Sequence, residues 1–266
     1  MARETPPSPS WRMEVARARE RLTAAGFLNP GDEARLLATA AGQSGDRLEE
    51  LVGRRTTGEP LPWILGWVDF CGIRLAIVPG VYVPRPQTEP LARRAARRLP
   101  SPGLAVDLGT GCGAIARVLG QRHPEAAVLG TESDPGAARC ARANSVEVVE
   151  GDLYEGLPDA WRGRVDVIVG ALPYVPDPEL PFLAHDVLAF EPRQALEGGP
   201  DGLRVLRRAV LGAAVWLRPG GRLLLELGAG QPQLLGPALE SAGLRPPRLL
   251  VDSAGDVRGI EALWPG

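Results

Sequence analysis

Lysine is absent from this sequence of 266 residues, so all 30 of its Lys or Arg residues are arginine. Without a lysine side chain the protein cannot form a Schiff base at such a residue, which excludes that class of chemistry. Cysteine is scarce, at three residues. Cys71, Cys112 and Cys140 are widely spaced and follow no metal-ligand pattern, so we expect no metal site and a reducing, cytoplasmic location.

Long hydrophobic runs are also missing. No stretch is long enough to span a bilayer, and the first residues, MARETPPSPSW, contain no apolar core of a signal peptide. Neither sign of charge dominates, because the formal net charge is −2. The dense basic run from Arg93 to Pro100 alternates with Ala and Leu at helical spacing, which favours a solvated helix face. We therefore expect neither a membrane nor a nucleic acid as partner.

The chain divides into three parts by pattern. Residues 1–60 are predicted to form a small helical domain, since Val15 and Leu22 recur at helical spacing and Asn29-Pro30-Gly31 separates two helical runs. Residues 61–87 are rich in β-branched and aromatic residues and are interrupted by Gly and Pro, which predicts a β-hairpin linker. Residues 88–266 form the third and largest part.

Strand and helix patterns alternate through residues 88–266. The strands are expected at 104–109, 127–132, 146–151, 165–170 and 221–228, with helical stretches between them. Near-continuous apolar strands that alternate with helices predict a parallel sheet covered on both faces. The fold class is therefore α/β, with a Rossmann-like domain and a small helical N-terminal domain.

A glycine-rich turn follows the first of these strands, in VDLGTGCGAIA. Asp107 ends the strand, and Gly109, Gly111 and Gly113 alternate before a helix begins. Glycine permits a tight turn and a close approach of a ligand to the backbone. Dinucleotide enzymes use similar loops, but the short G-x-G-x-G spacing after an aspartate favours S-adenosyl-L-methionine, which has no pyrophosphate.

Acidic residues end the next two strands as well. Glu132 lies about 20 residues beyond the glycine turn, where an acid can accept the ribose hydroxyls, and Asp152 is expected to meet the adenine amino group. Each alone could be a solvated loop carboxylate, but acids at the carboxyl ends of successive strands indicate one site. The predicted cofactor-binding residues are Asp107, Gly109, Thr110, Gly111, Gly113, Glu132, Ser133, Asp152, Leu153 and Gly170.

Three long motifs together resemble the release-factor glutamine N5-methyltransferases, a family of class I S-adenosylmethionine-dependent enzymes. They are the hairpin segment that ends in the Pro-Arg-Pro-x-Thr-Glu motif at 84–89, the loop DLGTGCGAIA, and FEPRQALEGGPDGL at 190–203. The resemblance covers nearly the whole chain. It implies a Rossmann-like methyltransferase domain, a helical substrate-docking domain at the N-terminus, and a final antiparallel strand from the C-terminal EALW region.

The chain departs from the family where a strand ends in Ala171-Leu172-Pro173-Tyr174. The family has Asn-Pro-Pro-Tyr there, and the resemblance implies that the Asn side chain and the next carbonyl bind the two N–H groups of a glutamine amide. Any residue at 172 supplies a carbonyl, but Ala171 supplies no side-chain acceptor. We therefore expect a repurposed pocket for a small aromatic acceptor, such as the indole C3 of a tryptophan-derived metabolite in bacterial natural product biosynthesis.

Other functions remain open at this point. The chain could still methylate a glutamine of a peptide chain release factor, or bind the cofactor without catalysis. An adenine methyltransferase on nucleic acid uses a similar motif, but the net charge and the missing Asn count against it. The oligomeric state is expected to be a monomer or a homodimer.

Candidate acceptor-site residues come from the altered strand end and from the other motifs. The predicted catalytic residues are Tyr174, Pro173, Glu191 and His185, and the predicted substrate-binding residues are Ala171, Leu172, Arg85 and Tyr82. His185 is also consistent with a surface or lid residue, and Glu191 and Arg193 are consistent with residues that tie their loop to the body by an ion pair.

Overall fold

The computed structural model of the protein describes residues 8–266, apart from the side chain of His185. The chain divides into two compact units. Unit 1 extends to Trp67 and includes Ala184–Phe190, whereas unit 2 consists of Val68–Leu183 and Glu191–Gly266. No helix within residues 8–266 is both long enough and apolar enough to cross a membrane.

Unit 1 is helical and has its own hydrophobic core. Its helices are α1 (Pro9–Ala24), α2 (Pro30–Ala41), α3 (Gly45–Thr56), α4 (Leu61–Leu65) and α8 (His185–Phe190). Ser8 and Ser44 cap α1 and α3, because their hydroxyls accept hydrogen bonds from backbone amides of the first turn. The core of unit 1 contains Leu22, Leu37 and Leu51, all less than 2% exposed.

The predicted hairpin between the two main parts is shorter than residues 61–87. Only β1 (Trp67–Phe70) and β2 (Ile73–Ala76) pair, and residues 61–65 form α4 instead. Pro62 stands in the first turn of α4, where a proline fits because the amide it lacks has no partner within the helix. Prolines at 79 and 84 prevent longer strands after β2.

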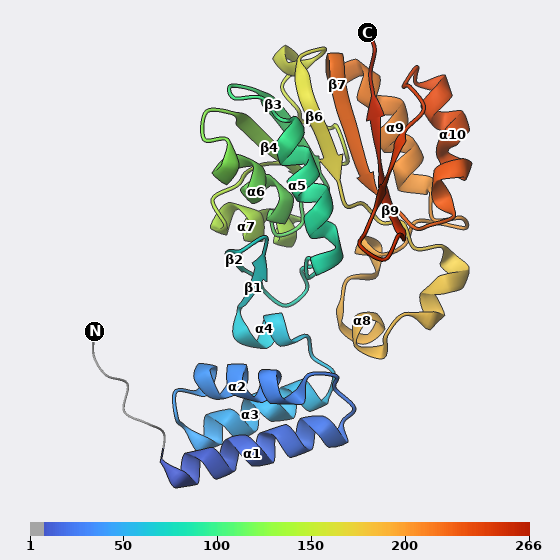
Figure 1. Cartoon of the computed structure of the whole chain (residues 1–266). Coiled ribbons are helices and arrows are strands. Elements are labelled where there is room, and N and C mark those ends of the chain that lie inside the picture. The colour runs from blue at the N-terminus through green and yellow to red at the C-terminus, as the bar shows by residue number, and fades with distance from the viewer. Residues whose placement is uncertain (1–7) are drawn as a thin grey trace. The chain divides into compact units, whose positions relative to one another are not determined.

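Unit 2 is built on a twisted seven-stranded sheet in the order β5-β4-β3-β6-β7-β9-β8 (Figure 1). The first five strands in this order are parallel, and β9 and β8 pair antiparallel at the edge. This confirms the predicted α/β Rossmann-like fold, with a mostly parallel sheet and a final antiparallel strand. The strands are β3 (Leu104–Leu108), β4 (Ala127–Glu132), β5 (Glu147–Glu150), β6 (Val165–Gly170), β7 (Leu217–Glu226), β8 (Arg248–Val251) and β9 (Val257–Leu263).

Helices cover both faces of this sheet, with α5 in front of it and α9 behind it in Figure 1. Every residue of β6 is buried, as expected for a central parallel strand with helices on both sides. The helices of unit 2 are α5 (Glu89–Arg98), α6 (Ala114–Arg122), α7 (Pro135–Ala143), α9 (Arg204–Trp216) and α10 (Gln231–Ser241).

The order of the strands determines where a ligand can bind. From β3 the chain moves outward to β4 and β5, and then returns to place β6 on the other side of β3. The carboxyl ends of β3 and β6 therefore lie side by side at the point where the strand order reverses. In open α/β sheets this is where ligands bind.

Candidate functional site

The glycine turn after β3 is organised around a buried aspartate. Oδ2 of Asp107 accepts hydrogen bonds from the Thr110 hydroxyl at 2.6 Å and from the amide of Ala116, in the first turn of α6, at 3.0 Å. Asp107 is 1% exposed, and its burial raises the pKa of its carboxyl to about 7, against the two hydrogen bonds that lower it. Asp107 thus holds the turn from beneath.

Gly109 and Gly111 have left-handed backbone conformations, with φ of +60° and +59°. A side chain on Gly109 would also place its Cβ 2.9 Å from Cδ2 of Leu172. These two glycines therefore let the turn bend sharply and keep the space above it open.

Glu132 joins the end of β4 to the glycine turn. Its Oε2 accepts a hydrogen bond from the Gly111 amide at 2.8 Å, and its Oε1 accepts one from the Asp134 amide at 2.9 Å. Each carboxylate oxygen retains a further lone pair for an external donor. Asp134 itself caps α7 by accepting from the Ala137 amide at 2.7 Å.

Asp152 and Leu153 follow β5 on the same edge of the sheet. Oδ2 of Asp152 forms an ion pair with Arg208 of α9 at 2.8 Å, and both side chains are about half exposed. Leu153 is 7% exposed and has a φ of 54°. The ion pair leaves the other carboxylate oxygen of Asp152 for a ligand.

The segment Ala171–Tyr174, which follows β6 and departs from the family motif, directs two of its side chains into the protein. Leu172 is 3% exposed and belongs to the main hydrophobic core of unit 2. The Tyr174 hydroxyl donates a hydrogen bond to Oε1 of Glu226 at 3.0 Å, and its backbone carbonyl accepts one from Nε2 of Gln231 at 2.8 Å.

Glu191 lies behind the predicted acceptor region, in an ion pair with Arg85. Its other oxygen accepts a hydrogen bond from the Val83 amide at 3.4 Å, and the Arg85 guanidinium lies 5.0 Å from the centre of the Tyr82 ring. The partner of Glu191 is thus Arg85, whereas Arg193 pairs with Glu197. An ion pair of Glu191 therefore ties this loop to the body, whereas the exposed Arg193 pairs within its own segment.

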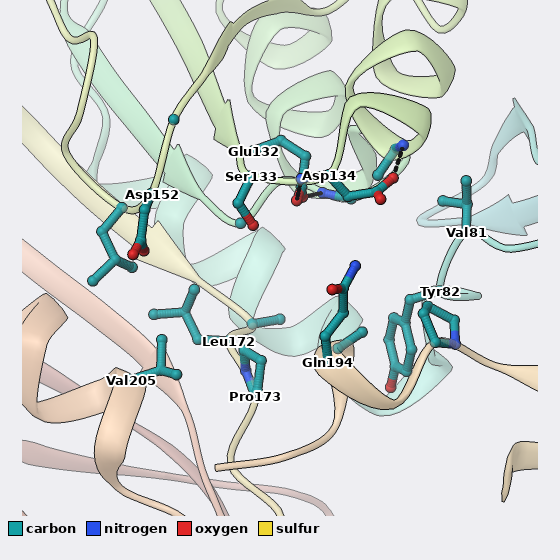
Figure 2. Close-up of a pocket in the computed structure, with 18 of the residues that line it drawn as sticks. Val81, Tyr82, Glu132, Ser133, Asp134, Asp152, Leu172, Pro173, Gln194 and Val205 are labelled. Carbon is teal, nitrogen blue, oxygen red and sulfur yellow. Dashed lines mark hydrogen bonds between the residues drawn. The ribbon is translucent and has the colours of Figure 1, made fainter. Parts of the chain in front are cut away.

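A pocket gathers many of these groups at the carboxyl ends of β3, β4 and β6, entirely within unit 2 (Figure 2). Its cavity volume is about 200 Å³, and the cavity is open to solvent on one side. The predicted site residues that line it are Tyr82, Gly109, Gly111, Glu132, Ser133, Asp152, Leu153, Ala171, Leu172 and Pro173.

Other predicted site residues lie outside the lining of this pocket. They support it from behind or from beneath and are Arg85, Asp107, Thr110, Gly113, Gly170, Tyr174 and Glu191. His185 begins α8, which belongs to unit 1, and its side chain is outside the described part of the structure.

Several pocket residues were not predicted from the sequence. Asp134 could have been, because an Asp before a Pro at the end of a strand is a typical helix N-cap. Arg208 and Gln194 carry no comparable signal, since a helix of the far layer and a turn after α8 bring them to the pocket.

The residues of the pocket fit S-adenosylmethionine. The left-handed Gly109 and Gly111 leave the turn open, and Glu132 and Asp152 line the pocket with spare acceptor capacity, which is what donors such as hydroxyl and amino groups require. Within residues 8–266, no group of three or more His, Cys, Asp or Glu side chains could hold a metal ion.

Comparisons with solved structures support the fold. A methyltransferase from Pyrococcus furiosus matches 84% of this chain with all of its own, at a TM-score of 0.53 and 19% sequence identity. A 16S rRNA methyltransferase of T. thermophilus matches 75% of this chain with 44% of its own, at a TM-score of 0.50 and 23% identity. No model of a protein family matches the chain.

Curated relatives are much closer in sequence. A release factor glutamine methyltransferase of Mycolicibacterium smegmatis is 38% identical over 81% of this chain and 83% of its own length. One of Geobacter sulfurreducens is 42% identical over 69% of this chain and 66% of its own length. A 4-amino-L-phenylalanine/4-methylamino-L-phenylalanine methyltransferase of Streptomyces pristinaespiralis is 39% identical over 82% of this chain and 77% of its own length.

These relatives correct the expected acceptor. The prediction of a repurposed pocket for an indole or another small aromatic molecule of natural product biosynthesis is wrong, because release factor glutamine methyltransferases of several bacteria match most of this chain. That prediction relied on the apolar side chains at 171 and 172, of which Leu172 is packed mostly into the core while it lines the pocket. The protein is an S-adenosylmethionine-dependent methyltransferase, and the chain belongs to the release factor glutamine methyltransferase family.

Proposed function

We propose that this protein methylates the side-chain nitrogen of a glutamine in a peptide chain release factor. The observation that carries the proposal is the sequence match to release factor glutamine methyltransferases, which extends over more than four fifths of the chain at 37–38% identity. Such a match includes residues of the helical unit 1 as well as of the methyltransferase unit. A protein acceptor is thus favoured over a small molecule.

The cofactor end of the pocket lies above the glycine turn. In the proposed complex the Gly109–Gly111 backbone faces S-adenosylmethionine, Glu132 accepts its ribose hydroxyls and Asp152 accepts its adenine amino group. Asp107 and Thr110 act indirectly, by holding the turn. When bound, the cofactor would supply an electrophilic methyl group to the glutamine amide nitrogen, and the pocket's opening to solvent would let the displaced amide proton leave to water.

The acceptor end is formed by the segment after β6. Ala171, Leu172 and Pro173 line it, with Tyr82 as a further wall. The Leu172 carbonyl is the proposed acceptor for one N–H of the glutamine amide, and it accepts no hydrogen bond from residues 8–266. Tyr174, Arg85 and Glu191 hold these walls in place through their buried contacts, so their proposed role is support.

The proposed role of residues 1–60 is to dock the release factor. Its described residues, 8–60, contribute most of a separate hydrophobic core, and none of them lines the pocket. The family resemblance supports the assignment.

Mass spectrometry of a purified release factor tests the proposed function. Incubation with the protein and S-adenosylmethionine is expected to add one methyl group to a single glutamine, and a release factor in which glutamate replaces that glutamine is expected to remain unmodified. A parallel incubation offers 4-amino-L-phenylalanine, the substrate named for the S. pristinaespiralis relative. Methylation of this amino acid without methylation of the release factor would overturn the proposal.

A further inference from the structure

The proposed glutamine acceptor leaves one hydrogen bond unaccounted for at Ala171. A carboxamide nitrogen carries two N–H groups, and both must be held to fix the plane of the amide. The Leu172 carbonyl can accept one of them, but the methyl group of Ala171 cannot accept the other. A buried N–H without a partner would cost the bound amide much of its affinity and orientation.

Gln194 brings a second carboxamide to the same pocket. It lies in the short 3-10 turn Arg193–Ala195 and lines the pocket together with Ala171, Leu172 and Pro173. Figure 2 shows its amide between Leu172 and Pro173 on one side and Tyr82 on the other, and extending across the pocket toward Ser133 and Asp134. Its side-chain oxygen is of the same chemical type as the Asn oxygen that the chain lacks at 171.

The turn that carries Gln194 is tied to the segment that carries Ala171. The Val175 amide donates to the Leu196 carbonyl at 3.0 Å, and the Gly198 amide donates to the Val175 carbonyl at 2.8 Å. These bonds form a parallel bridge between Val175 and Glu197. The two segments therefore hold a defined spacing, which a positioning side chain requires.

Other polar side chains of the pocket are already engaged or lie toward the cofactor end. Glu132 receives two backbone amides, Asp134 caps α7, and Asp152 pairs with Arg208. By contrast, the Gln194 carboxamide forms no hydrogen bond with another described residue. Gln194 is uncharged, so it can receive an amide N–H without adding a charge beside the methyl group.

We propose that Gln194 is a positioning residue that accepts the second N–H of the substrate glutamine and replaces the Asn missing at 171. The inference rests on the proposed function, whose acceptor is the glutamine amide. With one N–H on the Leu172 carbonyl and the other on Oε1 of Gln194, both N–H groups of the amide would be held, which would fix its plane for methyl transfer.

Replacement of the Gln194 side chain tests this role. Gln194→Leu removes the acceptor at similar size, and Gln121→Leu makes the same change at an exposed glutamine of α6 outside the pocket. We expect Gln194→Leu to lower kcat for methylation of the release factor about 100-fold. The Kd for S-adenosylmethionine, measured by calorimetry, is expected to stay within about twofold, because Gln194 is not among the groups assigned to the cofactor.

A double variant that restores a hydrogen-bond acceptor at position 171 gives the decisive test of the positioning role. Adding Ala171→Asn to Gln194→Leu is expected to recover at least about tenfold in kcat, whereas Ala171→Asn alone gains little because the position of the second acceptor is already filled. Gln194→Glu keeps an acceptor oxygen and is expected to retain more activity than Gln194→Leu.

Each contrary result has a distinct meaning. Unchanged kcat in Gln194→Leu, an equal fall in Gln121→Leu, or no recovery with Ala171→Asn would overturn the positioning role while the proposed function stands. Joint loss of cofactor binding and activity in Gln194→Leu would also overturn it, in favour of a structural role. A wild-type protein that leaves the release factor unmethylated would overturn the proposed function and, with it, this inference.

Discussion

The Tyr174 hydroxyl donates a hydrogen bond to Oε1 of Glu226 at 3.0 Å, which directs this aromatic residue away from the pocket and toward the end of β7. Glu226 is 5% exposed, and no hydrogen bond within residues 8–266 reaches its Oε2. Burial raises the pKa of Glu226, and the hydroxyls of Thr88 and Tyr174 counteract this only in part. The pair therefore links the pocket wall to a buried acid with few partners.

Loss of the Tyr174 hydroxyl is expected to destabilise the protein. Tyr174→Phe removes the donor to Oε1 of Glu226 and leaves a buried acid with even fewer partners, at a cost of about 1–3 kcal/mol in unfolding free energy. Urea unfolding measures this change. Tyr154→Phe is the matched control, because the Tyr154 hydroxyl donates to a backbone carbonyl of α9 and its loss should cost only about 0.5–1.5 kcal/mol. Equal costs for the two variants would show that Glu226 does not depend on Tyr174.

Asp107 is expected to make stability depend on pH. Burial raises its pKa in the folded protein to about 7, above the ~3.9 of an unfolded chain. The folded state therefore binds the proton more tightly than the unfolded state. The stability that Asp107 contributes is fully present below about pH 4 and is lost as the pH rises through 7. Without bound cofactor, the wild type should lose roughly 2–3 kcal/mol more than Asp107→Asn between pH 5 and pH 8, as measured by urea unfolding. Parallel pH profiles of the two proteins would contradict the assignment.

The fold could be predicted from the sequence because its signals are local. The segments 104–109, 127–132 and 165–170 are apolar, end in Gly or an acid and alternate with helical patterns, which specifies a parallel sheet and the edge where its site lies. The strand β8 was not predicted. It is short, mostly exposed, and pairs only with β9 at the edge, so it has neither alternation nor a long apolar run.

The candidate site was predictable only where residues lie next to a strand end. Glu132 and Asp152 were found in this way, but Gln194 and Arg208 reach the pocket from elements distant in sequence. The prediction of the methyl acceptor was wrong because it gave one substitution, at Ala171, more importance than the sequence similarity along most of the chain. A side chain lost from one segment can be replaced from another, and a strand motif read alone does not show this.

The carboxylate of Glu261 is expected to be a large contributor to the stability of unit 2. It is 2% exposed and pairs with Arg94 at 2.5 Å, Arg98 at 2.7 Å and Arg222 at 3.6 Å. Because Glu261→Ala leaves these partly buried guanidinium groups without their partner, we expect a loss of about 3–5 kcal/mol in urea unfolding.

The control for Glu261 is an exposed ion pair. Glu150→Ala breaks the contact with Arg142, whose two side chains are 43% and 47% exposed, and should cost less than about 1 kcal/mol. If Glu261→Ala lowered the unfolding free energy by a similarly small amount, water would have to solvate the arginines of α5 once the carboxylate is gone.

Glu132 is the residue whose removal should most directly weaken cofactor binding. Glu132→Ala removes the proposed acceptor for the ribose hydroxyls and also frees the amides of Gly111 and Asp134, which shape the turn. Loss of one charge-assisted hydrogen bond, worth about 1.5–3 kcal/mol, corresponds to a Kd for S-adenosylmethionine that rises at least about tenfold. Calorimetry measures it, with Glu125→Ala as the control at an exposed glutamate. If the Kd of Glu132→Ala were unchanged, another residue would have to hold the ribose, because alanine has no acceptor for the two ribose hydroxyls.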